Sequence, residues 1–213
     1  MLIAIPLFDR FTALDAVGPY EVLSRIPGAE VTFVGERTGP VRTDTAMLAM
    51  TVDDRLDDVD ACDVVVVPGG PGTRAMLTPG SLHEWVRHVH QGTQWTTSVC
   101  TGSLVLGTAG LLAGLEATTH WVAMDDLAPL CAATTHRRVV PQGKIVTAAG
   151  VSSGIDMSLW LAAQIAGDDV ARAIQLSIEY DPQPPFDAGS PDKAGPELVG
   201  LLRGIVRQQM AAS

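Results

Sequence analysis

The sequence predicts a single three-layer α/β domain with a mainly parallel sheet. Four short segments rich in β-branched residues are each followed by turn residues: Leu2–Leu7, Val31–Val34, Val64–Val67 and Trp95–Val99. Their apolar character is continuous and not alternating, which is typical of parallel strands covered on both faces. Helical patterns lie between these segments, and this alternation of strand and helix indicates an α/β fold.

The helices expected beside these strands carry recognisable signals. Thr12–Arg25 has apolar residues at helical spacing, although Gly18-Pro19 should bend or restart the helix. Ser81–Gln91 opens with a serine and has Glu84 three residues later, so Ser81 and Glu84 are predicted to form a capping box. After the fourth strand, a helix of small residues should run to about Ala109.

The second half of the chain is less regular. The expected elements are a short helix at Thr119–Leu127, a hairpin of Arg137–Val140 and Ile145–Thr147, and helices at Val151–Ala166 and Asp168–Ile178. Residues 181–196 hold five of the fourteen prolines, so we expect an irregular stretch there, followed by a last helix at Glu197–Gln209. We therefore predict one domain over residues 1–213, in which residues 181–213 form a Pro/Gly-rich extension and a terminal helix.

The composition disfavours several classes of protein. The 213 residues are 46% hydrophobic and 18% charged, which is not the balance of a disordered chain. With 24 acidic against 14 basic residues the net charge is −10, which disfavours binding to nucleic acid or to an anionic membrane. The three cysteines form no CxxC pair, so we expect free thiols in a reducing cytoplasm and no structural zinc. The N-terminal segment is predicted to be a strand and not a signal peptide.

The sharpest chemical signal is a cysteine at the junction of a strand and a helix. Cys100 directly follows Trp95–Val99, and the small residues Ser98 and Gly102 stand two positions before and after it. This is the spacing of a nucleophile elbow, in which the nucleophile occupies a strained turn. Free N–H groups at the start of the helix favour a thiolate, so we expect a low pKa and selective oxidation at Cys100. The alternative is an inert cysteine buried at the end of a strand.

Two further groups are expected at the same edge of the sheet. The loop Pro68-Gly69-Gly70 follows the third strand and lacks the signature of a phosphate loop, so the N–H groups of Gly69 and Gly70 are candidates to face a substrate. The alternative for this loop is a plain sharp turn. Asp15 follows the first strand among apolar neighbours, where burial would raise its pKa and keep it protonated. Alternatively, Asp15 is an exposed cap of the first helix.

Among the histidines, His120 is the candidate for chemistry. It follows Cys100 along the chain within Ala117-Thr-Thr-His120-Trp121, and a Cys–His pair would activate the thiol. The alternative is a histidine that is hydrogen-bonded in a wall of the fold. No cluster of histidine, cysteine and acidic residues has metal-binding spacing. The remaining histidines are expected at solvated positions: His83, His88, His90 and His136.

Taken together, three motifs resemble the DJ-1/PfpI superfamily: Pro68-Gly69-Gly70, Ser98-Val-Cys100-Thr-Gly102 and Ala117-Thr-Thr-His120-Trp121. The resemblance covers nearly the whole chain and implies a flavodoxin-like three-layer sandwich and a homodimer. Leu14-Asp15-Ala-Val-Gly18-Pro19 and the extension after Glu179 are similar to the isocyanide hydratase branch. Because amidase-like domains of AraC-type regulators carry similar elbow strings, the elbow does not specify the reaction.

The resemblance also implies roles for individual residues. The family's nucleophile falls on Cys100, its neighbouring acid on Asp15, and the groups beside the substrate on Gly69, Gly70 and Thr101. Many members have glutamate at the position of Asp15, and aspartate agrees with the hydratase branch. The implied reaction converts a small-molecule isocyanide and water to an N-substituted formamide through a covalent cysteine thioimidate. It needs no metal or organic cofactor, and it leaves His120 a secondary role.

Other functions stay open at the level of sequence. One is a different cysteine enzyme on the same fold, with amidase, peptidase or glyoxalase-like activity that uses Cys100 and His120. A second is a redox sensor or chaperone whose Cys100 becomes oxidised. A third, the sensor half of a transcription regulator, is disfavoured by the acidic charge of the chain.

Overall fold

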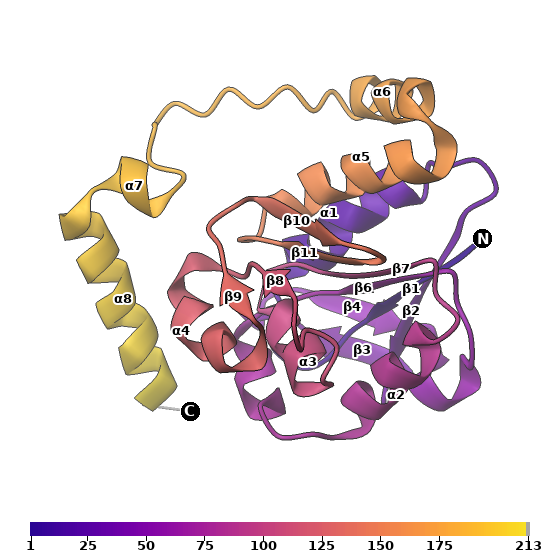
Figure 1. The fold of residues 1–213 in the computed structure, drawn as a ribbon, viewed down its shortest axis with the longest axis horizontal. Coiled ribbons are helices and arrows are strands. Elements are labelled where there is room, and N and C mark those ends of the chain that lie inside the picture. The colour runs from indigo at the N-terminus through magenta and orange to yellow at the C-terminus, as the bar shows by residue number, and fades with distance from the viewer. Residues whose placement is uncertain (212–213) are drawn as a thin grey trace. The chain divides into compact units, whose positions relative to one another are not determined.

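The computed structural model describes residues 1–211, with side chains up to residue 206 (Figure 1). The chain divides into two compact units, Met1–Glu179 and the segment from Tyr180 onward. The boundary falls directly before the proline-rich stretch. The second unit contains the helices α7 (Pro191–Ala194) and α8 (Pro196–Ala211), and α8 confirms the predicted last helix. Residues 212–213 of the predicted extension lie outside the described residues.

A seven-stranded sheet forms the centre of the first unit, in the order β10-β11-β7-β6-β1-β2-β5. All neighbouring strands are parallel except the edge pair β10–β11, which is antiparallel. The mainly parallel α/β sheet is therefore confirmed. Its strands are β1 (Leu2–Pro6), β2 (Glu30–Gly35), β5 (Asp54–Arg55), β6 (Val64–Val67), β7 (Trp95–Ser98), β10 (Val139–Gln142) and β11 (Ile145–Ala148).

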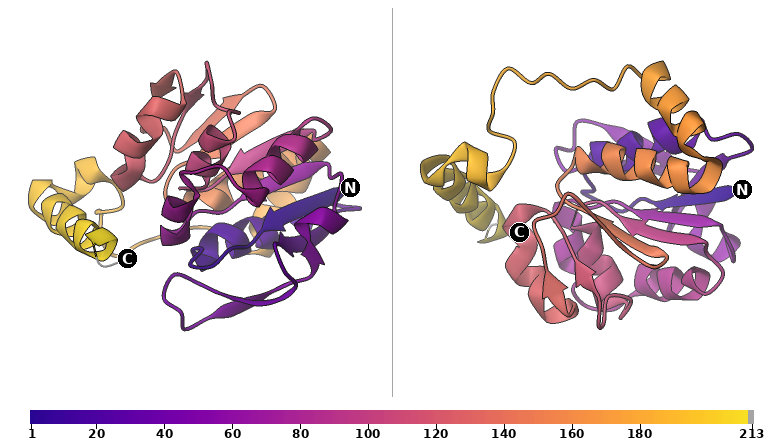
Figure 2. Two further views of the ribbon diagram at one scale, coloured as in Figure 1. Left: turned by 90° about the horizontal axis from the view of Figure 1, so that it is seen from below. Right: turned by 45° about the horizontal axis from the view of Figure 1, so that its top comes forward.

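Helices cover both faces of this sheet. One layer contains α1 (Ala13–Leu23), α5 (Ser153–Ala166) and α6 (Asp168–Ser177). The other contains α2 (Ser81–His90), α3 (Gly102–Thr108) and α4 (Met124–Leu127). Figures 1 and 2 show the two layers with the strands between them. Burial from both sides explains why all four valines of β6 are fully buried, as continuous apolarity predicted.

The structure also contains elements that the sequence did not predict. Two small sheets form outside the central one, β3 (Gly39–Arg42) with β4 (Ala49–Val52), and β8 (Glu116–Ala117) with β9 (Ala133–Thr134). The predicted helix at Thr119–Leu127 begins later, because Thr119 and His120 lie outside it and a 3-10 turn precedes α4. Within the described residues, no helix is long and apolar enough to cross a membrane.

Two local predictions about helices were wrong. The helix α1 continues through Gly18-Pro19 as one element, so the predicted restart was wrong, and its packing against α5 supplies stability that the proline removes. The helix α2 is capped at Gly80 and not at Ser81. The Gly80 N–H donates to Nδ1 of His83 at 3.0 Å, and Ser81 donates to Glu36. His83 is therefore buried, with 2% of its surface exposed, and not solvated as predicted.

Candidate active site

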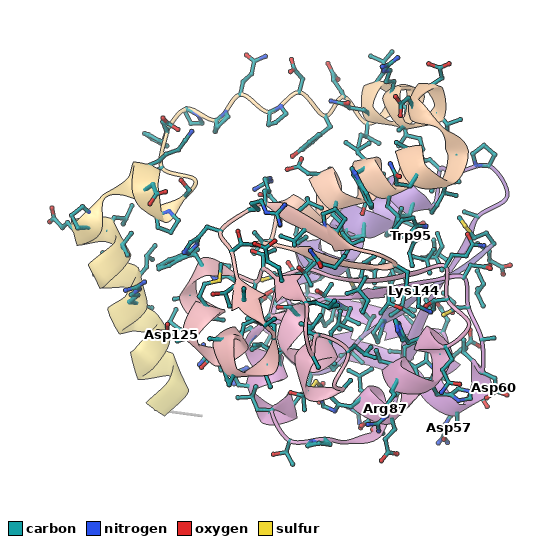
Figure 3. The ribbon with its side chains drawn as sticks, in the orientation of Figure 1. Asp57, Asp60, Arg87, Trp95, Asp125 and Lys144 are labelled. Atoms are coloured by element: carbon teal, nitrogen blue, oxygen red, sulfur yellow. The ribbon has the colours of Figure 1, made fainter. Side chains whose placement is uncertain are left out.

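The candidate site lies where parallel strands end. Cys100 follows β7, the Gly69–Gly70 loop follows β6, and α1 carries Asp15 after β1. In Figure 3, Trp95 and Lys144 mark the amino-terminal edge of β7 and β11, whereas Asp125 of α4 lies toward the opposite edge. The site is at this opposite edge, as expected for ligand sites in open α/β sheets.

The backbone of Cys100 has the strained conformation of a nucleophile elbow. Its φ is +91°, in the left-handed region that residues with a side chain rarely adopt. Gly102 is required at the second position after it, because a Cβ there would lie 2.2 Å from the carbonyl oxygen of Val67. Ser98, at the second position before it, is fully buried. The predicted elbow geometry is confirmed.

Hydrogen bonds fix the peptide groups on both sides of Cys100. Its N–H donates to the carbonyl of Ala148 at the end of β11, at 3.2 Å. Its carbonyl accepts one hydrogen bond from Oγ1 of Thr119 at 2.7 Å and another from Oγ of Ser103 at 3.2 Å. The turn therefore has partners on three different segments of the chain.

The Cys100 thiol is protonated at neutral pH. Burial is the main cause that raises its pKa well above the ordinary value, and the neighbouring Asp15 charge raises it further. The N–H groups of Val151 and Thr101 donate toward the sulfur and lower the pKa only in part. The predicted low pKa of Cys100 was therefore wrong, because the residue is only 4% exposed and desolvation outweighs the N–H donors.

Asp15 is fully buried in the first turn of α1 and interacts with Cys100. Its Oδ2 accepts the N–H of Gly69 at 2.9 Å, while its Oδ1 has no hydrogen-bond partner within the described part of the chain. Burial is the largest cause that raises its pKa to about 7, against the lowering effects of the Gly69 N–H and the Cys100 thiol. The exposed-cap alternative was wrong, since Thr12 occupies the N-cap position.

The loop Gly69–Gly70 is hydrogen-bonded to Asp15 and Thr101. Gly70 has a φ of +135°, and its N–H donates to Oγ1 of Thr101 at 2.8 Å, which in turn donates to the Gly70 carbonyl at 3.1 Å. A Cβ on Gly69 would lie 2.5 Å from the Thr101 nitrogen, so the two segments approach too closely for a side chain. Both N–H groups that were expected to face a substrate thus have partners inside the protein.

Val151 is a site residue that sequence reasoning missed. Its N–H donates toward the Cys100 sulfur from the turn between β11 and α5. The sequence does contain a signal for it. The predicted strand Ile145–Thr147 ends shortly before a predicted helix, and this puts Ala149–Val151 at the same edge of the sheet as Cys100. The N–H groups that face the Cys100 sulfur are therefore those of Thr101 and Val151.

His120 lies beside the site and is not paired with Cys100 in the described part of the chain. Within the described residues no hydrogen bond joins it to Cys100, and its Nδ1 instead accepts the Val122 N–H at 3.4 Å. Its ring lies against Gly150, where a Cβ would be 2.9 Å from Cδ2. Burial lowers its pKa, so the ring is neutral at pH 7. Residues 1–211 also contain no group of three histidine, cysteine or acidic side chains that would hold a metal ion.

Comparison with known proteins agrees with this architecture. The pattern of the DJ-1/PfpI family matches residues 1–164. The chain belongs to the DJ-1/PfpI family. It is 41% identical over 197 residues to the isonitrile hydratase of Pseudomonas putida, a match that covers 92% of this chain and 86% of the relative.

Solved structures of this family share the fold. A ThiJ/PfpI family protein from Pseudomonas syringae superposes with a TM-score of 0.92 at 34% identity, covering 97% of this chain and 86% of that one. Drosophila melanogaster DJ-1β superposes with a TM-score of 0.76 at 22% identity, covering 84% of this chain and 97% of that one. The predicted family and fold class are thereby confirmed.

Proposed function

We propose that this DJ-1/PfpI family member is an isocyanide hydratase with Cys100 as its covalent nucleophile and Asp15 as its acid–base group. The observation that carries the proposal is the buried carboxyl of Asp15 beside the thiol, with one oxygen that has no hydrogen-bond partner among the described residues. The 41% identity to an isonitrile hydratase supports the same reaction class.

The first step forms a thioimidate. Asp15, as a carboxylate, takes the proton from the Cys100 thiol while the sulfur attacks the terminal carbon of the isocyanide. The protonated Asp15 then gives this proton to the same carbon, so the S–H bond is replaced by an S–C bond and a C–H bond. One carboxyl thus serves as base and then as acid, and such help contributes about 10²- to 10⁴-fold to a rate.

The second step consumes water. Water adds across the C=N bond of the thioimidate, its oxygen going to carbon and a proton to nitrogen. When this adduct collapses, the C–OH group becomes the C=O group of the formamide and the S–C bond breaks. The hydroxyl proton goes to the sulfur, and the N-substituted formamide is released. The N–H groups of Thr101 and Val151 stabilise the sulfur while it carries negative charge in either step.

The geometry favours this reaction over an amidase or peptidase mechanism. Those reactions would use a thiol–imidazole pair, and His120 has its Nδ1 bonded to Val122. An isocyanide carbon needs a proton at the attacked atom, and Asp15 is the acid placed beside the sulfur.

The test incubates the purified protein with phenyl isocyanide and follows N-phenylformamide by chromatography. We expect turnover, ¹⁸O from labelled water in the product, and a covalent adduct on Cys100 by mass spectrometry of the quenched enzyme. Cys62→Ala is the matched control, since it removes another buried thiol. Absence of formamide, with cleavage of amide or peptide substrates instead, would replace the proposal by the cysteine-hydrolase alternative.

We further propose a cytoplasmic homodimer that needs no metal or organic cofactor. Three free cysteines suit a reducing compartment, and the chemistry above is complete with side chains and water. Sedimentation velocity should give the mass of a dimer, and dialysis against a chelator should leave activity unchanged. A monomeric mass or loss of activity on chelation would contradict these two parts of the proposal.

A further inference from the structure

Two neighbouring threonines of the Ala117-Thr-Thr-His120 motif differ in what their hydroxyls do. Thr118 and Thr119 are both fully buried. Oγ1 of Thr119 donates to the carbonyl of Cys100 at 2.7 Å. Oγ1 of Thr118 has no hydrogen-bond partner within the described part of the chain. The motif therefore reaches the nucleophile through Thr119.

The carbonyl that Thr119 holds belongs to the strained residue of the elbow. With a φ of +91°, Cys100 gains free energy by relaxing toward a negative φ, and such a rotation moves its carbonyl and its side chain together. A hydrogen bond to the carbonyl opposes this relaxation. Ser103 supplies a second and longer bond at 3.2 Å, but it sits in the helix that begins at the elbow itself.

Thr119 acts from outside the elbow. Its segment is tied to the central sheet, because the N–H of Thr118 donates to Oγ1 of Thr147 in β11 at 3.0 Å. It is also tied to the small sheet, where Ala117 pairs with Thr134. The hydroxyl is thus presented from a fixed position, and it can resist a movement of the turn that Ser103 would follow.

We propose that Thr119 is a positioning residue, whose hydroxyl holds Cys100 in its left-handed conformation and so keeps the sulfur facing Asp15 and the N–H groups of Thr101 and Val151. The effect on isocyanide turnover rests on the proposed function. The effect on the thiol does not, because the position of the sulfur decides its reactivity whatever the substrate is.

The test compares Thr119→Val, Thr119→Ser and Thr118→Val. Valine replaces a buried hydroxyl by a methyl group of similar size, and serine keeps the hydroxyl. We expect Thr119→Val to lower kcat for phenyl isocyanide about 10- to 100-fold with little change in KM, because the reacting groups are misplaced. Thr119→Ser should stay within a few-fold of wild type. Thr118→Val should do the same, because its hydroxyl has no hydrogen-bond partner among the residues that the structure describes.

A second readout separates this proposal from the hydratase proposal. Iodoacetamide alkylation of Cys100, followed by mass spectrometry across a pH series, needs no isocyanide. A displaced sulfur loses the Asp15 charge, which raises its pKa, and the two N–H donors, which lower it. The alkylation profile of Thr119→Val should therefore shift along the pH axis, and its rate at a fixed pH should differ from wild type by about three- to tenfold. If neither wild type nor any variant hydrates isocyanides but this shift appears, the positioning role of Thr119 stands. Only the proposed hydratase function is then rejected.

Two outcomes would overturn the role of Thr119. One is an unchanged kcat and alkylation profile in folded Thr119→Val. The other is an equal loss in Thr118→Val, which would show that any polar-to-apolar change in this segment disturbs the site. If Thr119→Val fails to fold, the pair Thr119→Ala and Thr119→Ser provides the test, since these two variants differ only by the hydroxyl that donates to the Cys100 carbonyl. Thr119→Ala should lower kcat and shift the alkylation profile relative to Thr119→Ser, and equal behaviour of the two would count against the proposal.

Discussion

The Cys100 thiol stabilises the carboxylate form of Asp15 by a hydrogen bond, while the charge of that carboxylate disfavours ionisation of the thiol. The two groups therefore form one titrating pair in which the carboxyl ionises first. At neutral pH the thiol keeps its proton and Asp15, with a pKa of about 7, is divided between acid and carboxylate. In the proposed mechanism the reactive form is the carboxylate beside the thiol, because only that form has a base for the first proton transfer.

The activity should therefore rise with pH through the range in which Asp15 ionises. We expect kcat/KM for an aromatic isocyanide to increase around pH 7, since burial raises the Asp15 pKa to about that value. Initial rates in constant-ionic-strength buffers would check this profile. A rate that falls as the pH rises through 7 would mean that the protonated acid is the active form.

The same titration should appear in the stability of the fold. The pKa of Asp15 is about 7 when folded and about 3.8 when unfolded, so the native state binds the extra proton between these values. The contribution of Asp15 is complete below about pH 3.8 and is lost as the pH rises through 7. The free energy of unfolding of Asp15→Asn relative to wild type should thus increase over this window, by roughly a few kcal/mol. Urea unfolding across the pH series measures it, and a constant difference would contradict the raised pKa.

Of the three cysteines, only Cys100 should be needed for activity. Cys62 is buried, and desolvation together with the Asp63 charge raises its pKa to about 12, so it stays a thiol. Cys131 donates to the carbonyls of Leu127 and Ala133, outside the elbow. We expect Cys100→Ala to abolish isocyanide hydration, and Cys62→Ala and Cys131→Ala to retain most of it. Turnover by Cys100→Ala would end the covalent mechanism.

Local patterns in the sequence were enough to find the elbow, its strand and its acid. Apolar β-branched runs define the buried strands, and the spacing of Ser98, Cys100 and Gly102 is a local steric requirement that the φ of +91° confirms. The carboxyl ends of parallel strands meet at one edge, which is why the sequence predicts Asp15 at that edge.

The rest depends on contacts between distant segments. The Cys100 pKa is set by total desolvation, which no neighbouring residue in the sequence reveals. The N–H groups of Gly69 and Gly70 have side-chain partners that arrive from other elements. Thr119 and Val151 lie on two later segments of the chain, which contact Cys100 only in the folded protein.

His120 should matter only modestly. Its neutral ring packs against Gly150 and Trp121 and accepts the Val122 N–H, so its removal loosens the wall of the site without removing a reacting group. We expect His120→Ala to lower kcat/KM less than about tenfold, below the effect of a general acid or base. Steady-state kinetics would decide, and a loss as severe as that of Cys100→Ala would favour the Cys–His mechanism.

The decisive variant is Asp15→Asn. Asparagine is nearly isosteric, its carbonyl can still accept the Gly69 N–H, and its amide can still face the sulfur, so binding of the substrate should change little. It cannot accept and return a proton. We therefore expect kcat to fall by about 10²-fold or more at pH 7, with the pH dependence near 7 removed.

The Asp15→Asn protein should also unfold at a higher urea concentration than wild type above pH 7, because an uncharged amide replaces a carboxylate that burial disfavours. A less active but more stable protein excludes misfolding as the cause, whereas wild-type turnover in folded Asp15→Asn would remove Asp15 from the mechanism.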